Sequence, residues 1–300
     1  MESQSPSKIP VIDLSKEDLK PGTKTWVLTC QEIRHAMEVF GCFEGIFSKV
    51  SLELHNQVFG TTEELFDLPT EIKMKNTSTK PYFDYFGQYS YLPLYESLGI
   101  DNPTTLESTQ SFTNLMWPFG NDRFCESALS YSDLMVELDK MVIGMVFESY
   151  GVERCYESYI ESVNYLLRYF KYRTPDMIET TMGLTPHTDK TMTSIIHQNH
   201  INGLQIKTRD SEWIDVQPSS PSSFIVMAGD ALMGEVNSGL YYVGLKLDTS
   251  TPRLDERDTS DEVQGFTKRI GILPNGRKRS GRCQWGIMIS VGNHKGGKFR

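Results

Sequence analysis

The stretch Gly183-Leu-Thr-Pro-His187-Thr188-Asp189 stands just before the apolar pair Ile195-Ile196. In an extended strand, residues two apart project from the same face, so this stretch puts an imidazole and a carboxylate side by side. Both groups are ligands for divalent metal ions. His187 and Asp189 are therefore the candidate metal ligands. Taken alone, the His-x-Asp pattern is more typical of a loop histidine with a capping aspartate than of a metal site. The neighbouring sequence has to distinguish between the two.

Upstream, apolar residues follow helical spacing, which predicts helices over residues 27–40, 51–65 and 133–150, each followed by a glycine or proline. Residues 9–14 read as a strand, and residues 76–120, rich in Tyr, Pro, Gly and Asn, as loops and turns. Downstream, short β-rich runs separated by turn residues favour a sandwich or jelly roll. The predicted fold class is α+β, with helices first and a β domain second. These β-rich runs cover residues 165–172, 191–197, 203–207, 213–216 and 223–227.

Composition excludes several functional classes. The net charge of −9 argues against a nucleic-acid partner. The N-terminal residues carry no secretory apolar segment, and no run approaches the roughly 18 apolar residues of a membrane span. The five cysteines are scattered without metal-binding spacing, as expected of free thiols in a reducing compartment. The expectation is a cytoplasmic protein without a membrane partner.

Further motifs surround His187 in a fixed order. An arginine–tyrosine strand at Leu167–Pro175 precedes it, and Asn202–Ile206, Trp213–Val216 and Val226–Leu232 follow. In this order and spacing, residues 8–233 resemble the plant Fe(II)/2-oxoglutarate-dependent dioxygenases, whose helical N-terminal region packs on a double-stranded β-helix (jelly roll). The Leu94–Ile100 stretch and the lysine after Asp189 are most similar to the alkenyl- and hydroxyalkyl-producing dioxygenases of glucosinolate biosynthesis.

The resemblance implies roles for individual residues. His187 and Asp189 match two of the family's three iron ligands, and Tyr172 matches the tyrosine that contacts 2-oxoglutarate. The asparagine expected two residues before that tyrosine is Phe170 here, a departure from the family pattern. The implied cofactors are Fe(II) and the co-substrate 2-oxoglutarate, with ascorbate as a candidate third. The implied partner is a small molecule of the glucosinolate class, bound by a monomer.

The resemblance breaks after residue 233. The second histidine ligand should fall near Leu245, yet no histidine occurs between His200 and His294, and no Arg-x-Ser follows Asp230. Residues 266–300 hold nine Lys or Arg and no Asp or Glu, and only Gly286–Val291 resembles a strand. An altered reading frame or a mis-spliced exon would produce such a junction.

These observations predict three segments: a helical region over 1–120, a truncated jelly-roll core over 121–233, and a disordered basic tail over 234–300. The last strands of the jelly roll are expected to be missing or replaced, and Fe(II) and 2-oxoglutarate binding to be impaired. The favoured function is an inactive dioxygenase. Two alternatives stay open, namely an active enzyme with an atypical third ligand (His294, Glu235 or Tyr241) and a non-catalytic binding protein that uses the basic tail. His197 and His200 are interpreted as ordinary strand or turn residues.

Overall fold

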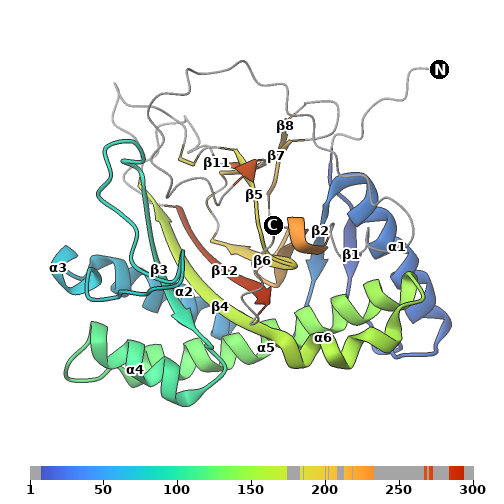
Figure 1. Ribbon diagram of the computed structural model, residues 1–300, viewed down its shortest axis with the longest axis horizontal. Coiled ribbons are helices and arrows are strands. Elements are labelled where there is room, and N and C mark those ends of the chain that lie inside the picture. The colour runs from blue at the N-terminus through green and yellow to red at the C-terminus, as the bar shows by residue number, and fades with distance from the viewer. Residues whose placement is uncertain are drawn as a thin grey trace.

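Helices α1 to α6 all precede strand β4, and most strands follow it (Figure 1). The computed structural model describes residues 8–173, 183–184, 186–199, 201, 203–207, 213–217, 219–232, 267–268, 270–272 and 284–293. The elements in chain order are β1 (Val11–Asp13), α1 (Lys24–Phe40), β2 (Cys42–Ile46), α2 (Leu52–Asp67), α3 (Thr70–Lys73), β3 (Tyr95–Asp101), α4 (Leu106–Met116), α5 (Asp122–Ser149), a 3₁₀ turn (Glu153–Cys155), α6 (Tyr156–Ser162), β4 (Val163–Tyr172), β5 (His187–Thr188), β6 (Thr193–Gln198), β7 (Leu204–Lys207), β8 (Trp213–Asp215), β9 (Ser223–Ala228), β10 (Thr267–Lys268), β11 (Ile270–Ile272) and β12 (Gln284–Asn293).

Seven strands form the large sheet in the order β1-β2-β9-β6-β12-β4-β3. Every neighbouring pair is antiparallel except β1 and β2, which run parallel. Two small sheets complete the β domain, one made of β10 and β5, the other of β11, β7 and β8. Strands distant in the chain are therefore neighbours in space, which is the arrangement of a sandwich rather than of a meander.

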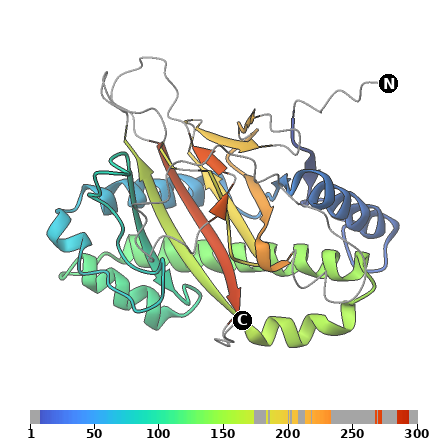
Figure 2. The same ribbon diagram turned by 45° about the horizontal axis from the view of Figure 1, so that its top comes forward.

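The large sheet separates two hydrophobic cores. Its outer face packs on the helices, with α5 running along it in both views (Figures 1 and 2). Its inner face packs on the small sheets. Because strand residues alternate between faces, β4 supplies Leu167 and Tyr169 to the outer core and Phe170 and Tyr172 to the inner one. The order of helices first and sheets second is as predicted from the sequence.

Helix boundaries follow local capping. Thr23 accepts a hydrogen bond from the Trp26 backbone at the start of α1, and Gly41 ends the helix with a φ of 74°. Helix α5 begins at Asp122, capped by Asn121, whereas the sequence pattern predicted a start near residue 133. The prediction placed the cap too late because the chain between them is amphipathic as well. The expectation of loops alone over 76–120 was also wrong, since β3 and α4 lie there.

Strand β12 corrects the expectation of a disordered tail over residues 284–293. All ten of its residues pair with β4, and five of them pair with β6 on the other side. The physical reason is local alternation: Trp285, Ile287, Ile289 and Val291 are buried against the helices. The resemblance of Gly286–Val291 to a strand, seen in the sequence, is confirmed, and the strand extends to Gln284 and Asn293. The last strand of the large sheet is therefore present, although its sequence departs from the family pattern.

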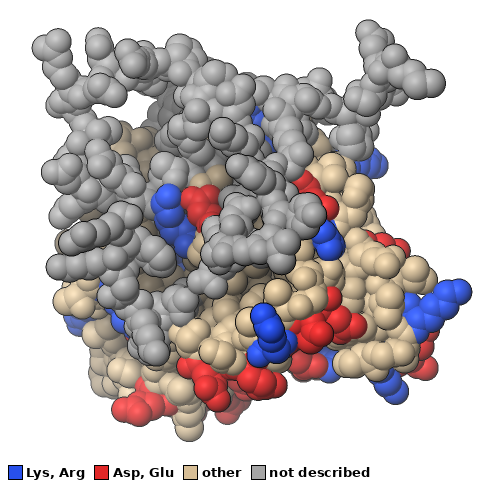
Figure 3. Space-filling model, turned by 45° about the vertical axis from the view of Figure 1, so that its right-hand side comes forward, with Lys and Arg blue, Asp and Glu red and all other residues tan. Residues whose placement is uncertain are grey.

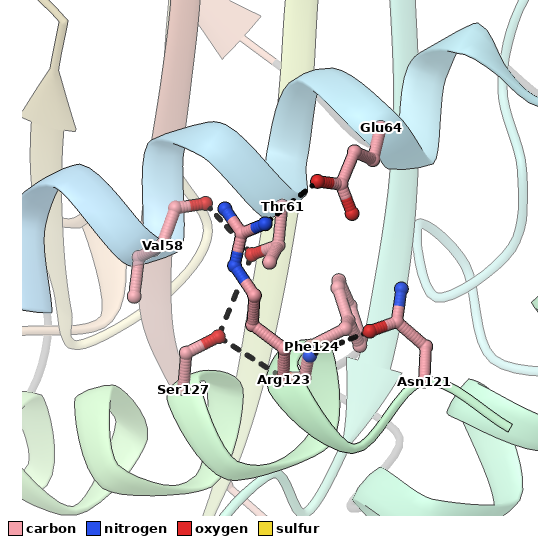
Figure 4. A network of polar contacts seen from close by, with 7 residues as sticks. All are labelled: Val58, Thr61, Glu64, Asn121, Arg123, Phe124 and Ser127. Atoms are coloured by element: carbon pink, nitrogen blue, oxygen red, sulfur yellow. Dashed lines mark hydrogen bonds and ion pairs between the residues drawn. The ribbon is translucent and has the colours of Figure 1, made fainter.

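Helix α2 is joined to α5 by packing and by one ion pair (Figure 4). The Arg123 Nη1 atom lies 3.0 Å from Glu64 Oε1, and the Thr61 and Ser127 hydroxyl oxygens are 3.4 Å apart. Gly60 leaves room for the guanidinium, since a Cβ there would come within 2.9 Å of it. Exposed pairs of this kind contribute little to stability. Packing of the two helices therefore holds α2 in place.

The charged side chains on one face of the described residues are of both signs. On the face in Figure 3, acidic and basic side chains are interspersed. No helix in the described part of the chain is long and apolar enough to cross a membrane.

Truncation tests the place of β12. A chain ending at residue 283 would leave β4 and β6 with unpaired edges and expose the outer core, so we expect loss of cooperative thermal unfolding and aggregation. A chain ending at residue 293 keeps the strand and is the matched control. Circular dichroism melting and size-exclusion chromatography measure the difference. A cooperative transition in the shorter chain, with a midpoint equal to the control's, would contradict this role.

Candidate metal site

The two predicted ligands lie together at strand β5. The His187 Nε2 atom is 3.6 Å from Asp189 Oδ1, and both side chains are largely buried. The backbone of Asp189 is fixed from the other side, because the Asp230 N–H donates to its carbonyl oxygen at 2.7 Å. The His-x-Asp pattern therefore places an imidazole and a carboxylate next to each other, as the strand geometry predicts.

The Asp189 carboxylate is held in its ionised form. Burial raises its pKa, but the His187 imidazole, the Ser194 hydroxyl and the Arg168 guanidinium outweigh burial, and the net pKa lies below the ordinary value. The Ser194 hydroxyl donates to Oδ2. A metal-ligating carboxylate needs this protonation state. Ser194 and Arg168 are neighbours of the site that the sequence did not point out as such.

The Gly229-Asp230 turn braces the same stretch. Asp230 Oδ2 accepts hydrogen bonds from Thr188 Oγ1 at 3.0 Å and from Lys190 Nζ at 3.1 Å. Gly229 packs so closely on the chain that a Cβ at this position would come within 1.9 Å of the Thr191 carbonyl oxygen. Only glycine fits there. The motif that carried part of the family resemblance thus has a structural task in holding β5.

The described residues do not provide a third protein ligand. No group of three His, Cys, Asp or Glu side chains that could hold a metal ion occurs among them. In the backbone register of β5 with β10, the residue opposite His187 is Lys268. The predicted ligand position near Leu245 and the alternative donors His294, Glu235 and Tyr241 lie outside the described residues, as does His200. The described donors therefore do not fit a facial triad.

The inner face of β4 places Tyr172 and Phe170 side by side in the inner core. Tyr172 is 2% exposed, its ring centroid is 4.9 Å from that of Tyr95, and burial is the largest cause of its raised pKa. The Phe170 ring covers Gly286 of β12 so closely that a Cβ there would come within 2.2 Å of it. An aromatic ring therefore fills the space where the family's asparagine is expected. Tyr172 as a co-substrate contact stays a prediction.

His197 lies on the outer face of the large sheet, away from the metal ligands. Its Nδ1 atom is 3.1 Å from the Tyr131 hydroxyl, and its Nε2 atom is 3.0 Å from the Pro221 carbonyl oxygen and 3.1 Å from His55 Nδ1. Burial, with His55 beside it, lowers its pKa to about 3. His197 is therefore a neutral core histidine, as the sequence interpretation had it.

A cavity of about 560 Å³ opens at the ends of β3 and β4, outside the metal site. Neither His187 nor Asp189 contributes to its wall. Basic side chains are prominent in its lining, together with Glu96, but Lys73 already pairs with Glu96 at 2.8 Å. The lining residues are Lys73, Gln88, Tyr89, Ser90, Pro93, Leu94, Tyr95, Glu96, Lys171 and Arg173.

Comparison with known proteins settles the family. The chain is 42% identical over 240 residues to the probable 2-oxoglutarate-dependent dioxygenase AOP1.2 of Arabidopsis thaliana, an alignment that covers 78% of this chain and 73% of that protein. Residues 162–240 match the 2OG-Fe(II) oxygenase superfamily model. The chain belongs to the 2OG-Fe(II) oxygenase superfamily. Residues 9–111 match a second model, described as non-haem dioxygenase in morphine synthesis N-terminal.

A second relative and a solved structure extend the comparison. The probable inactive 2-oxoglutarate-dependent dioxygenase AOP2 of Arabidopsis thaliana is 29% identical over 315 residues, covering 77% of this chain and 78% of that protein. Among solved structures, the dioxygenase for auxin oxidation 1 from Arabidopsis thaliana, in complex with 2-oxoglutarate, superimposes with a TM-score of 0.73 at 20% identity, covering 95% and 93% of the two chains. The predicted α+β class and jelly roll are confirmed, and the family implies Fe(II) and 2-oxoglutarate as cofactors.

The buried His197 makes stability depend on pH. Its folded-state pKa of about 3 lies below the ordinary value of 6.5, so the unfolded chain binds a proton that the folded chain refuses. Its contribution is fully present above pH 6.5 and is lost as pH falls toward 3, at roughly 1.4 kcal/mol per pH unit. Asp139, whose pKa is raised to about 6 by burial, gives a slope of opposite sign below pH 6, so the comparison is between variants. We expect the slope of the urea unfolding free energy from pH 7 to 5 to be larger in wild type than in His197→Asn, by up to about 1.4 kcal/mol per pH unit. His35→Asn, on the exposed face of α1, is the control; equal slopes in wild type and His197→Asn would refute the assignment.

Proposed function

We propose that this chain is an inactive 2-oxoglutarate-dependent dioxygenase. One observation carries the proposal: the described residues offer two metal donors, His187 and Asp189, and the backbone register puts Lys268 opposite His187. Non-haem Fe(II) in this family of sites is held by two histidines and one carboxylate. The described residues therefore supply two of the three protein ligands that a ferrous ion needs in such a site.

The chemistry of lysine supports this reading. An ammonium group has three N–H donors and no lone pair, and its ordinary pKa near 10.4 keeps it protonated at neutral pH. A lysine is therefore not a metal ligand at neutral pH. The residue type that the backbone register puts opposite His187 does not replace the missing histidine.

Co-substrate binding is also expected to be weakened. The family clamps the distal carboxylate of 2-oxoglutarate with an Arg-x-Ser, and no such sequence follows Asp230. Arginine suits this task because its planar guanidinium forms paired hydrogen bonds with a carboxylate. In addition, the Phe170 ring lies against Gly286 and occupies part of the inner core beside Tyr172.

The motifs around Leu94–Ile100 and His187 support an origin among enzymes that modify aliphatic glucosinolate side chains. The ancestral reaction in that class is oxidation of a small molecule, by desaturation or hydroxylation. We propose a cytoplasmic monomer, in agreement with the free thiols of Cys30, Cys42, Cys125 and Cys155. An active enzyme with a third ligand outside the described residues is the alternative that the next experiment separates.

Purified protein should show neither turnover nor the Fe(II) centre of an active relative. We expect no succinate from 2-oxoglutarate, and no weak metal-to-ligand charge-transfer band when Fe(II) and 2-oxoglutarate are added without oxygen. A clear band that disappears in His187→Ala would overturn the proposal and support the enzyme with an atypical ligand.

Position 268 offers a gain-of-binding test. Residues directly opposite in an antiparallel pair have Cβ atoms about 5 Å apart, so Lys268→His puts an imidazole at the position nearest to His187 across the strands. We expect anaerobic Fe(II) affinity to rise at least about tenfold, ~1.4 kcal/mol, and the gain to vanish in Lys268→His with His187→Ala. Lys207→His, in β7 of the small sheets, is the control. Equal affinities for Lys268→His and wild type would show that a histidine at position 268 does not reach the metal ion bound by His187.

A further inference from the structure

Arg168 is a buried arginine on the inner face of the large sheet. It lies on β4 two residues before Phe170 and shares the face of Phe170 and Tyr172, because strand residues alternate. In register it stands beside Gly99 of β3 and Met288 of β12. The Arg168 side chain therefore lies on the face of the large sheet that packs on the small sheets, the same face as Tyr172.

The partners of this guanidinium do not match its charge. Arg168 is 6% exposed, and its Nε atom has no hydrogen-bond partner among the described residues. No carboxylate among those residues forms an ion pair with it, and the one described hydrogen bond runs from Nη2 to the carbonyl oxygen of Tyr82. Buried charges are normally paired, because removing an ion from water is costly. The buried guanidinium of Arg168 therefore has no anionic partner among the described residues.

Tyr82 holds the guanidinium in one orientation. Its carbonyl oxygen accepts from Nη2, and its ring centroid is 5.7 Å from the guanidinium carbon. Tyr82 has a φ of 74°, a left-handed conformation that is unfavourable for residues other than glycine. The loop is also pressed onto β3, since a Cβ on Gly99 would come within 2.9 Å of the Phe83 carbonyl oxygen. Strained, closely packed backbone of this kind marks functional positions.

Other unsatisfied polar atoms lie on the same inner face. Gln284 donates to Gln198 Oε1 at 3.1 Å, which leaves Gln198 Nε2 and Gln284 Oε1 without partners among the described residues. The Ser97 hydroxyl, on β3, is in the same state. In register Gln284 stands beside Tyr172, and Ser97 beside Phe170. The inner core thus combines a cation with polar donors and an acceptor, as ligand sites do.

We propose that Arg168 binds an oxyanion of a small organic ligand in the space between the two sheets, and that this binding does not need a metal ion. The ligand carries a carboxylate, sulfate or sulfonate at the guanidinium, where Nε and Nη groups form paired charge-assisted hydrogen bonds. Its uncharged polar groups meet the amides of Gln198 and Gln284. The chain then retains a binding function although its metal site is incomplete.

Isothermal titration in the presence of a chelator tests this, with three probes: 2-oxoglutarate, an aliphatic glucosinolate, which carries a sulfate, and its uncharged desulfo derivative. We expect at least one of the two anions to bind, and the desulfo compound to bind at least tenfold more weakly than the glucosinolate if the sulfate is the ligand. The anion that binds shows whether the Arg168 site takes the co-substrate, 2-oxoglutarate, or the substrate class, a glucosinolate. Because metal is removed, the result does not depend on whether the chain turns over.

Variants then assign the contact. Arg168→Gln should lower the affinity for the anion that binds at least tenfold. Arg168→Lys keeps the positive charge but not the planar guanidinium, and should lower the affinity less. Lys171→Gln is the matched control. Lys171 lies on the same strand but lines the cavity at the ends of β3 and β4, and its Nζ atom is 4.7 Å from the centre of the Trp285 ring. Circular dichroism verifies that each variant folds. If Arg168→Gln does not fold, the comparison of glucosinolate and desulfo-glucosinolate binding to the wild-type protein still tests the proposal. Binding of neither anion, or a loss in Lys171→Gln instead of Arg168→Gln, would overturn the proposal.

Discussion

The hydrogen-bonded ladder on both edges of β12 joins the two halves of the large sheet. Without it, β3 and β4 would form one fragment and β6, β9, β2 and β1 another. The same strand buries Trp285, Ile287, Ile289 and Val291 against the helices and sets Gly286 under the Phe170 ring. The outer core, the inner core and the position of β4 all depend on this one insertion. The jelly roll is thus closed by a strand whose sequence no longer follows its family.

Closure of the sheet and completion of the metal site are separate requirements. A central strand needs apolar alternation and backbone hydrogen bonds, and many sequences supply these. A metal site needs particular donor atoms at particular positions. Residues 284–293 meet the first requirement. In the β10–β5 pair, by contrast, the residue opposite His187 in the backbone register is a lysine. A chain can therefore keep the architecture of an oxygenase even where its described residues do not group three metal donors.

Sequence reasoning reached the α+β class, the three longest helices (α1, α2 and the later part of α5) and the His187–Asp189 pair, because these depend on local periodicity and spacing. It did not predict the shorter helices α3, α4 and α6. It missed the early start of α5 and the strand β3, where capping and pairing decide over composition. It recognised Gly286–Val291 as strand-like but still assigned these residues to a disordered tail, because the basic residues around them dominate the composition and the pairing partners are distant in the chain. It had no signal for Ser194, for the orphaned Arg168 or for the strained Tyr82, since each depends on contacts between residues distant in the chain.

Gly229 has a consequence for how such chains are recognised. Its Cα packs against the Thr191 carbonyl oxygen, and Asp230 beside it ties together Thr188 and Lys190. Both residues would be maintained by the demands of folding alone, with no turnover to preserve. A search for signature motifs would count them as marks of a working enzyme. In this superfamily, a retained glycine–aspartate turn indicates an intact fold. Whether a chain is an active enzyme has to be judged from its metal-binding donor atoms.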